Sequence, residues 1–318
     1  MKDVDTAHPI ITTIAQPDAK RRPKEIPVNE QAKKLRGILN GKKPLVSMGV
    51  WDPYSAMVAE QEGFETLTIF GSMVSWSLLG MTDTGYMTQT EVIDVARRIV
   101  ARVSVPVIVD CDDGFGDPIN VRRTVQLVEQ VGAAGLYIED LSRPLRCSAL
   151  GGGGLVPAEV MVQKIRAAVD ARVNPDFFLM ARTDAYVPVK EIAARAKRYV
   201  EAGVDMVLVI GLDKAEDLRA VAQQAGVPLA TIQAARTKHA FLSHKALIDM
   251  GYRGMFHVQP MYMAAAHAMR ESARMLRADI DKGTDVPRVL PGPSPVEIET
   301  TIGLKLDDEL NTRYFAKQ

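Results

Sequence analysis

The chain repeats one unit from residue 29 onward: a short apolar run, a turn, and then a segment with helical spacing of its apolar residues. Strands that are buried on both faces read as continuous apolar runs, so the repeat favours a parallel sheet covered by helices. The expected strands are Pro44–Met48, Thr66–Phe70, Val105–Val109, Ala134–Ile138, Phe177–Ala181, Met206–Ile210, Pro228–Ile232 and Gly254–Val258.

The helical segments lie between these runs, and several of them end on a glycine that fits a left-handed C-cap. The helices are expected at Pro53–Glu62, Thr88–Arg102, Asn120–Val131, Ala158–Ala171, Val189–Ala202 and Ala215–Ala225, and the capping glycines at Gly63, Gly132, Gly203, Gly226 and Gly251. Eight strand–helix units over roughly 230 residues predict a closed (β/α)8 barrel of the TIM type, which takes ~250 residues. A doubly wound open sheet is the alternative, although it usually has fewer strands.

The two ends of the chain differ from this repeat. Residues 1–28 carry Pro, Lys, Arg and Asp without apolar periodicity, which is typical of a flexible arm or of a segment that becomes ordered on a partner subunit. The barrel domain is expected over residues 29–282. Residues 283–318 form a Pro/Gly-rich linker and a helical tail, with the helix roughly at Val296–Arg313. A tail set apart in this way packs on another subunit in many proteins, so we expect a homo-oligomer.

The composition limits the partners and the compartment. Lys plus Arg equals Asp plus Glu, at 39 each, so no basic field attracts nucleic acid or an anionic membrane. No apolar stretch approaches the ~20 residues of a membrane span, and the N-terminus lacks a signal-peptide pattern. Cys111 and Cys147 are too few for a disulfide framework. We expect a soluble cytoplasmic protein that acts on a small molecule.

Three of the apolar runs lead directly into charged residues. A charge at the end of a buried strand is costly unless it meets a metal, a partner or a polar ligand. The carboxyl ends of parallel barrel strands meet at one rim, where functional groups collect. The rim is expected to carry Gly71, Ser72, Asp83, Asp110, Asp112, Glu139, Arg182 and Thr231.

The acidic residues of this rim favour a metal site. Carboxylate oxygens without a histidine cluster suit Mg²⁺, with Mn²⁺ as an alternative. A single such Asp more often caps a helix or pairs with an arginine. Asp110, Asp112 and Glu139 together favour the metal interpretation.

Cys147 lies in a loop after the fourth apolar run, shortly before the four glycines of 151–154. Consecutive glycines hold one conformation only at a high entropic cost, so this loop is expected to move. It resembles a lid that delivers a reactive group, with Arg146 favouring the thiolate of Cys147. An incidental loop cysteine is the alternative.

Taken in order, several short motifs resemble the isocitrate lyase / phosphoenolpyruvate mutase superfamily between about Leu45 and Arg277. They are specific for the superfamily but not for one reaction. The motifs are Trp51-Asp-Pro-Tyr-Ser-Ala56, Gly71-Ser72, Leu79-Gly-Met-Thr-Asp-Thr-Gly85, Val109-Asp-Cys-Asp-Asp-Gly-Phe-Gly116, Gly135-Leu-Tyr-Ile-Glu-Asp140, Lys164-Ile-Arg-Ala-Ala168, Ala181-Arg-Thr-Asp-Ala185 and Tyr199-Val-Glu-Ala-Gly203.

The resemblance implies a (β/α)8 barrel whose last helix is exchanged between subunits, usually in a tetramer built as a dimer of dimers. It also implies roles for the rim residues. Mg²⁺ would be held, directly or through water, by Asp83, Asp110, Asp112 and Glu139. The substrate would be bound by Trp51, Gly71, Ser72, Arg182 and Thr231, and the catalytic groups would be Arg146, Cys147 and Arg182.

The chain departs from the lyase pattern at several positions. Leu145, Ser148 and Ala149 stand where the lyase branch has Lys, Gly and His. Ile210-Gly211 stands where many members have a glutamate after the sixth strand, and Thr231 stands where lyases often place Asn. The leading hypothesis is a Mg²⁺-dependent carbon–carbon lyase that cleaves a small 2-hydroxy or 2-oxo di- or tricarboxylate, similar to 2-methylisocitrate, through an enolate-type intermediate. The main alternative is an oxaloacetate-type decarboxylase. A phosphonate hydrolase or mutase, and a barrel that only binds, are weaker alternatives.

Overall fold

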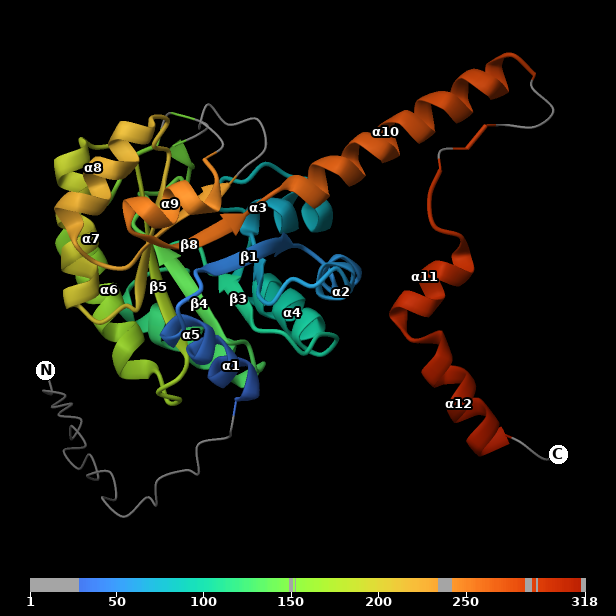
Figure 1. Ribbon diagram of the computed structural model, residues 1–318, viewed down its shortest axis with the longest axis horizontal. Helices are drawn as coiled ribbons and strands as arrows, with labels where there is room; N and C mark the ends of the chain where they lie inside the picture. The colour runs from blue at the N-terminus through green and yellow to red at the C-terminus, as the bar shows by residue number, and fades with distance from the viewer. Residues whose placement is uncertain are drawn as a thin grey trace, which may run out of the picture.

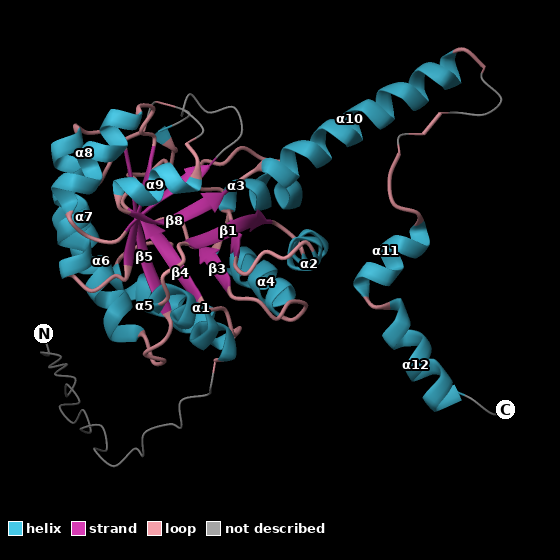
Figure 2. Cartoon of the chain, viewed as in Figure 1, coloured by secondary structure: helices cyan, strands magenta, loops and turns pink. Residues whose placement is uncertain are grey.

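Eight parallel strands close into a barrel in chain order, β1 to β8, and helices surround it (Figures 1 and 2). The computed structural model describes residues 29–148, 151, 153–233, 242–283, 288–289 and 291–315, so the predicted arm over residues 1–28 lies outside the described residues. The strands are β1 (Leu45–Val50), β2 (Leu67–Ile69), β3 (Val107–Asp110), β4 (Gly135–Glu139), β5 (Phe178–Asp184), β6 (Met206–Ile210), β7 (Leu229–Gln233) and β8 (Tyr252–His257). The predicted TIM-type barrel is confirmed.

Most helices follow the strands around the outside of the barrel (Figure 2). They are α2 (Pro53–Gln61), α4 (Gln89–Val100), α5 (Pro118–Gln130), α6 (Ala158–Ala171), α7 (Val189–Glu201), α8 (Ala215–Ala225) and α9 (His244–Met250). Before β1 comes α1 (Glu30–Asn40); after β2 come a short α3 (Gly71–Val74) and a π-helix, η1 (Ser75–Leu79). The last helices are α10 (Pro260–Asp281), α11 (Pro295–Ile302) and α12 (Leu304–Phe315).

The five glycines predicted as helix caps all have a left-handed backbone. Their φ angles lie between +61° and +115°, a region that costs glycine nothing and other residues much more. The list is Gly63, Gly132, Gly203, Gly226 and Gly251. Each lets the chain leave a helix and turn towards the next strand.

Most predicted boundaries are wrong by one or two residues, and two predictions differ from the structure by more. β5 continues past Ala181 to Asp184, because the charged residues at its end are buried and paired with one another. The single tail helix predicted at Val296–Arg313 is divided into α11 and α12 at Gly303, whose φ is +122°.

The barrel has two cores because side chains alternate across each strand. In β6, Met206, Leu208 and Ile210 belong to the cluster inside the barrel, whereas Val207 and Val209 pack against the surrounding helices. The inner cluster fills the barrel interior, as in other TIM barrels, so chemistry is confined to the ends of the strands.

α1 lies across the N-terminal ends of the strands and links several of them. Gln31 donates to the carbonyl of Val103 and accepts from the Val107 amide, and Arg36 pairs with Asp205 at 2.6 Å. The N-terminal end of the barrel is therefore closed by packing and hydrogen bonds.

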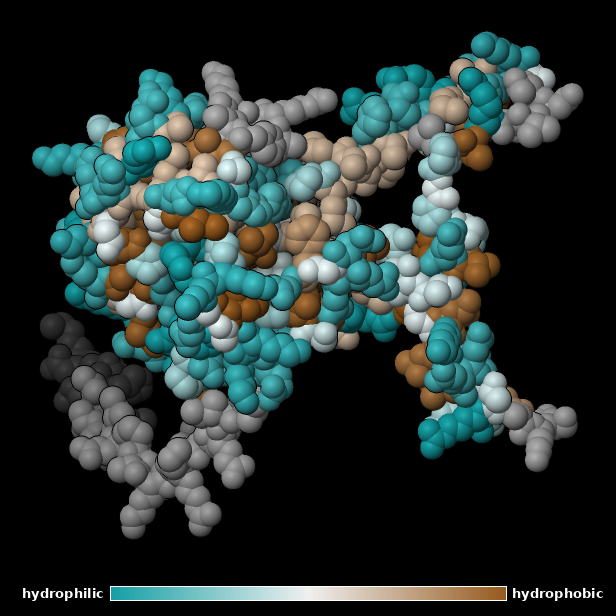
Figure 3. Space-filling view, viewed as in Figure 1, coloured by the Kyte–Doolittle hydropathy of each residue, from teal (hydrophilic) through white to brown (hydrophobic). Residues whose placement is uncertain are grey.

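α10 leaves the barrel and extends away from it, and α11 and α12 follow at a distance from the strands (Figure 1). Exposed apolar side chains recur along this segment, visible as brown patches on α11 and α12 (Figure 3). They include Met269, Leu276, Ile280, Val296, Leu306, Leu310 and Phe315. In the described part of the chain, no helix has both the length and the apolar character that a membrane crossing requires.

Gly135 provides a test of the packing between β4 and β5. An added Cβ would lie 2.4 Å from the Phe178 carbonyl oxygen and 2.6 Å from its Cβ, so Gly135→Ala should destabilise the protein by about 1–3 kcal/mol through overpacking. Gly37→Ala is the control. Gly37 lies in α1 with no atom within 4 Å of an added Cβ, and alanine there should raise stability by roughly 0.5–1 kcal/mol. Urea unfolding followed by circular dichroism measures both; equal midpoints would contradict the packing argument.

Candidate active site

A small cavity opens at the C-terminal ends of β3, β4 and β5, with about 250 Å³ of empty space when the open solvent at its mouth is included. Seven of the residues predicted for the site line it, together with Leu141 and Leu145. The seven are Asp83, Asp110, Asp112, Glu139, Arg146, Cys147 and Arg182. Residues that are up to a hundred positions apart in sequence therefore face one space because the parallel strands end at the same rim.

Arg182 is the central cation of this cavity. Its Nη1 atom lies 2.8 Å from Glu139 Oε2, its Nε donates to Asp184 Oδ1 at 2.8 Å, and its Nη2 donates to Asp184 Oδ2 at 3.2 Å. Burial alone lowers the pKa of Arg182, but the charges of Asp184, Glu139 and Cys147 together raise it well above its ordinary value. Arg182 therefore stays a cation and holds a fixed orientation.

The acids around Arg182 outnumber the cations, and their pKa values reflect this excess. Burial and the nearby Asp110 charge raise the pKa of Asp83 from 3.8 to about 6. Burial, helped by Asp110 and Asp83, raises the pKa of Asp112 well above its usual range. Burial raises the pKa of Glu139 in the same direction, although Arg182 opposes the shift. The carboxylates that line the cavity repel one another, and an added cation would reduce this repulsion.

Gly71 allows the backbone to approach these acids. Its N–H donates to Asp110 Oδ2 at 2.9 Å, and an added Cβ would lie 3.3 Å from that oxygen and 3.4 Å from Asp112 Oδ1. Ser72 follows in α3 and is half-buried. The turn after β3 is strained, since Asp112 has a φ of +46°. This local backbone directs several polar groups to one point.

The donor set fits a hard divalent cation that keeps part of its water shell. Within the described parts of the chain, no three His, Cys, Asp or Glu side chains form a complete direct ligand set. Mg²⁺ is commonly held by only one or two carboxylates plus water. Four oxygen-bearing acids around one cavity, with unrelieved repulsion and no imidazole among its lining residues, match that requirement.

The loop between Leu141 and Leu155 carries Cys147 to the cavity. A β-bridge between these two leucines pins the base of the loop, and the Ser142 amide donates to the Gly154 carbonyl at 2.8 Å. Cys147 is half-buried and packs against the inner core. Cys147 therefore lies at the same cavity as the acids, and its role as a reactive group stays a prediction.

On the outer side of the same two strands, a second set of polar residues holds Asp140. Its Oδ2 accepts from Tyr199 Oη at 2.6 Å, from Thr183 Oγ1 at 2.9 Å and from Arg195 Nη1 at 3.0 Å. Asp140 follows Glu139 and Thr183 follows Arg182, so each inward residue has an outward neighbour in this network. The network ties the ends of β4 and β5 to α7.

Two predicted substrate-binding residues lie elsewhere. The prediction for Thr231 is wrong as to its direction: Ala230 and Ile232 on either side belong to the inner core, so Thr231 faces outward from β7. Trp51 follows β1 and packs edge-on against Tyr262, with ring centroids 5.0 Å apart, and does not line the acidic cavity. Trp76 contacts the same tyrosine at 5.3 Å, which forms an aromatic group beside α3.

Asp184 is the functional residue that the sequence reasoning missed. It is fully buried and receives two donors from Arg182. The signal was present, because residues two apart in a strand share a face and Asp184 stands two positions after Arg182. The predicted strand ended at Ala181, so Asp184 was not assigned to the inward face of β5.

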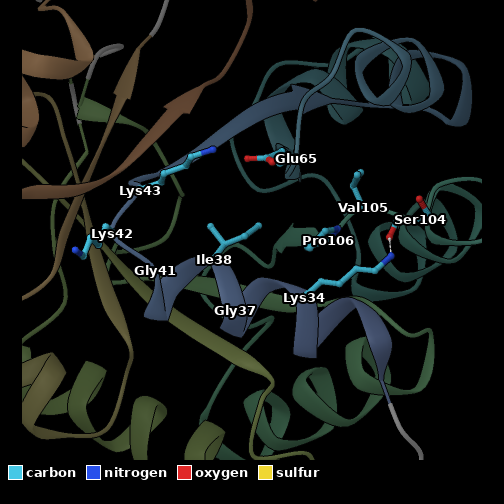
Figure 4. Close-up of a pocket in the computed structure, with 10 residues that line it drawn as sticks. All are labelled: Lys34, Gly37, Ile38, Gly41, Lys42, Lys43, Glu65, Ser104, Val105 and Pro106. Atoms are coloured by element: carbon cyan, nitrogen blue, oxygen red, sulfur yellow. Dashed lines mark hydrogen bonds between the residues drawn. The ribbon is translucent and has the colours of Figure 1, made fainter.

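A broader hollow of about 920 Å³ lies at the opposite end of the barrel, between α1 and the segments that precede β1, β2 and β3 (Figure 4). Lys34, Lys42 and Lys43 line it, and Lys34 donates to the Ser104 carbonyl at 2.9 Å. Such N-terminal faces of parallel barrels contribute to stability and not to chemistry. The smaller acidic cavity is therefore the candidate active site.

Comparison with known proteins agrees with this location. The family model described as phosphoenolpyruvate phosphomutase matches residues 35–277, which is more than half of the chain and contains every residue lining the acidic cavity. The chain belongs to this family. The phosphoenolpyruvate phosphomutase family is part of the superfamily, with isocitrate lyase, that the sequence motifs predicted, so that prediction is confirmed.

Curated relatives of this family member carry lyase and decarboxylase names. It is 36% identical over 252 residues to 2,3-dimethylmalate lyase of Eubacterium barkeri, covering 78% of this chain and 86% of the relative. It is also 36% identical to 2-methylisocitrate lyase of Aeropyrum pernix, over 79% of this chain and 80% of that protein. Oxaloacetate decarboxylase 1 of Pseudomonas fluorescens is 34% identical, over 74% and 81%. The protein is an enzyme, a carbon–carbon lyase of this superfamily.

Solved structures share the fold of this family member along nearly their whole length. Oxaloacetate acetylhydrolase bound to the inhibitor 3,3-difluorooxalacetate superposes with a TM-score of 0.82 and 31% identity, covering 90% of this chain and 97% of that one. Phosphonopyruvate hydrolase in complex with oxalate and Mg²⁺ superposes with a TM-score of 0.78 and 26% identity, covering 90% and 99%.

Asp83 gives a pH test of the crowded carboxylates. Its folded-state pKa of about 6 exceeds the ordinary 3.8, so its contribution to stability is present at low pH and is lost as the pH rises through about 6. Asn cannot ionise. Relative to the native protein in EDTA, Asp83→Asn should therefore gain stability as the pH rises from 4 to 7, by about 2–3 kcal/mol.

The control for this measurement is Asp94→Asn on the exposed side of α4. Hydrogen bonding to Arg97 lowers the pKa of Asp94, so its replacement should give no gain at neutral pH. Denaturant unfolding at several pH values measures the difference. A flat difference between Asp83→Asn and the native protein would contradict the carboxylate repulsion.

Proposed function

We propose that the protein is a Mg²⁺-dependent lyase that cleaves a carbon–carbon bond in a small 2-hydroxy or 2-oxo di- or tricarboxylate. The observation that carries the proposal is that Cys147, Arg182 and the rim acids all face one cavity. A carbon–carbon cleavage next to a carboxylate needs a fixed cation for the charge that develops and a proton donor for the departing carbanion. This cavity offers both.

Arg182 is suited to orient the substrate. Its guanidinium is buried and held by Glu139 and Asp184, so its position is set before the substrate arrives. A preorganised donor of this kind stabilises an oxyanion without reorganising during the reaction, which typically accounts for several kcal/mol of barrier reduction. Gly71, whose N–H donates to Asp110 Oδ2 here, and the neighbouring Ser72 would bind an oxygen of the substrate carboxylate.

Asp83, Asp110, Asp112 and Glu139 would hold Mg²⁺, directly or through water, and Mn²⁺ would suit the same oxygens. When bound, the metal would supply Lewis-acid stabilisation of the enolate-type anion. The raised pKa values of Asp83, Asp112 and Glu139 support this assignment, since a divalent cation would favour their ionised forms.

Cys147 would act as the general acid in a 2-methylisocitrate-like retro-aldol cleavage. The carbon–carbon bond breaks, the 2-hydroxyl loses its proton to a cavity carboxylate, and the thiol of Cys147 gives a proton to the departing carbanion. The nearby charge of Arg182, together with the adjacent Arg146, would stabilise the thiolate that remains.

The second candidate is an oxaloacetate-type decarboxylase. Leu145 and Ser148 flank Arg146 and Cys147 where the lyase branch has Lys and Gly, which weakens the case for a thiol acid. A decarboxylation of a 2-oxo acid needs the metal and Arg182 but no proton from Cys147. The relative named oxaloacetate decarboxylase 1 supports keeping this alternative.

Product analysis with and without the thiol separates the two reactions. The protein is incubated with Mg²⁺ and a panel of substituted malates, 2-methylisocitrate and oxaloacetate, and 2-oxo acid and CO₂ release are measured. We expect 2-oxo acid without CO₂, its loss in EDTA, and a drop of about 10²–10⁴-fold in kcat for Cys147→Ser. Cys111→Ser, in the other, buried cysteine, is the control. Wild-type turnover in Cys147→Ser would reject the thiol acid, and CO₂ release would favour the decarboxylase.

We also propose a homo-oligomer, built as a tetramer in which the α10–α12 segment packs on a second copy of the chain. Exposed apolar side chains along these helices support the proposal, because apolar patches of this extent mark interaction surfaces. Light scattering should give a mass that is a multiple of 34.8 kDa, and a chain ending at residue 259 should be smaller than that assembly. A monomer at micromolar concentration would contradict the proposal.

A cytoplasmic location is part of the same proposal, and cell fractionation tests it.

A further inference from the structure

Ser148 and Gly211 meet beside the candidate active site although they come from different segments. Ser148 directly follows Cys147 in the loop after β4, and Gly211 directly follows β6. The Ser148 N–H donates to Asp184 Oδ2 at 2.8 Å, and its hydroxyl donates to the same oxygen at 2.9 Å. The residue after the cysteine is thus fixed to the carboxylate that also holds Arg182.

Gly211 leaves the space that Ser148 occupies. A Cβ at position 211 would lie 2.2 Å from Ser148 Oγ and 3.0 Å from Ser148 Cβ, and 3.2 Å from the Ala185 Cβ. No side chain at 211 is compatible with Ser148 in this place. The backbone of Gly211 also has a φ of +89°, which favours glycine.

The contact between Ser148 and Asp184 affects stability because Asp184 is a buried carboxylate. It is fully buried, and its two oxygens receive four donors, two from Arg182 and two from Ser148. If Ser148 moved away, Oδ2 would keep only the longer contact with Arg182, at 3.2 Å. Leaving a buried carboxylate with half of its hydrogen-bond donors is unfavourable, so the hydrogen bonds from Ser148 to Asp184 fix the position of the loop that carries Cys147.

A second contact steadies the same loop tip. Tyr186 Oη donates to the Arg146 carbonyl at 2.8 Å, on the other side of Cys147. The cysteine is thus bracketed by two hydrogen-bonded residues, one anchored to the last residue of β5 and the other to the segment that follows it. Its thiol has little freedom to leave the cavity.

We infer that Ser148 and Gly211 are a matched pair of positioning residues whose fit sets the place of Cys147 over Arg182 and the acids. The pair acts through the loop and touches no reacting atom. Its consequence for turnover rests on the proposed lyase function, but its effect on the cysteine does not.

Alkylation of Cys147 tests the pair without any substrate. Iodoacetamide labelling is followed by mass spectrometry of the Cys147 peptide, with the fully buried Cys111 as an internal reference. Gly211→Ala should accelerate labelling about tenfold, the factor expected when a hydrogen bond to a charged group is lost. The matched control is Gly63→Ala, which has nearly the same φ, +87°, but no atom within 4 Å of the added Cβ.

Rescue distinguishes the pair from general loosening. In Ser148→Gly/Gly211→Ala the clash with the Ser148 side chain is removed and the backbone N–H of residue 148 can still reach Asp184, so labelling should fall from the Gly211→Ala rate to about the Ser148→Ala rate; such non-additivity marks residues in contact. Ser148→Ala, which creates no clash, should label severalfold faster and serves if Gly211→Ala fails to fold.

Equal labelling of Gly211→Ala and the native protein would overturn the inference, as would a double variant that labels as fast as Gly211→Ala. Native protein in which Cys147 reacts as fast as a cysteine in a short peptide would overturn it as well. If the variants show the expected labelling rates but the protein has no lyase turnover, the pairing of Ser148 with Gly211 stands and the proposed function is rejected. The two proposals can therefore fail independently.

Discussion

The site depends on one buried cation. Arg182 lies in the barrel wall with Glu139 on one side and Asp184 on the other, and each acid would be costly to bury without it. The arrangement explains why β5 can continue through two charged residues to its end. It also explains why the remaining acids are left without a matching charge, since Arg182 is already engaged. This shortage of positive charge supports the proposed metal site.

The two ends of the barrel have separate tasks. At the N-terminal end, α1 and its hydrogen bonds close the strands, and the lysine-lined hollow beside it contains none of the acids of the active site. At the C-terminal end, the last residues of the strands and the loops after them bring polar groups to a small cavity. The packed interior between the ends isolates one from the other, so polar chemistry at the rim does not weaken the core.

Much of the fold was predictable from local patterns. The apolar runs mark strands that are buried on both faces, and the glycines mark helix ends that need a left-handed backbone. α6, α8 and β6 occur at the predicted residues, and the acids at the strand ends meet in one cavity as expected. What failed depends on partners that are distant in sequence. The length of β5 is set by the ion pairs of Arg182, one of them with Glu139 on β4, and the outward direction of Thr231 is set by strand register, where a shift of one residue reverses the face. The contact of Ser148 with Gly211 joins two loops, which local patterns do not reveal.

The outer network of Asp140, Thr183, Arg195 and Tyr199 stands directly behind Glu139 and Arg182. Because side chains alternate between the two faces of a strand, each inward residue is joined by a peptide bond to an outward one. A library of random variants selected for altered turnover should therefore yield hits on α7, in the second layer of the molecule, at positions that no ligand reaches. Adaptation of this enzyme to new acids has a route through its scaffold as well as through its pocket.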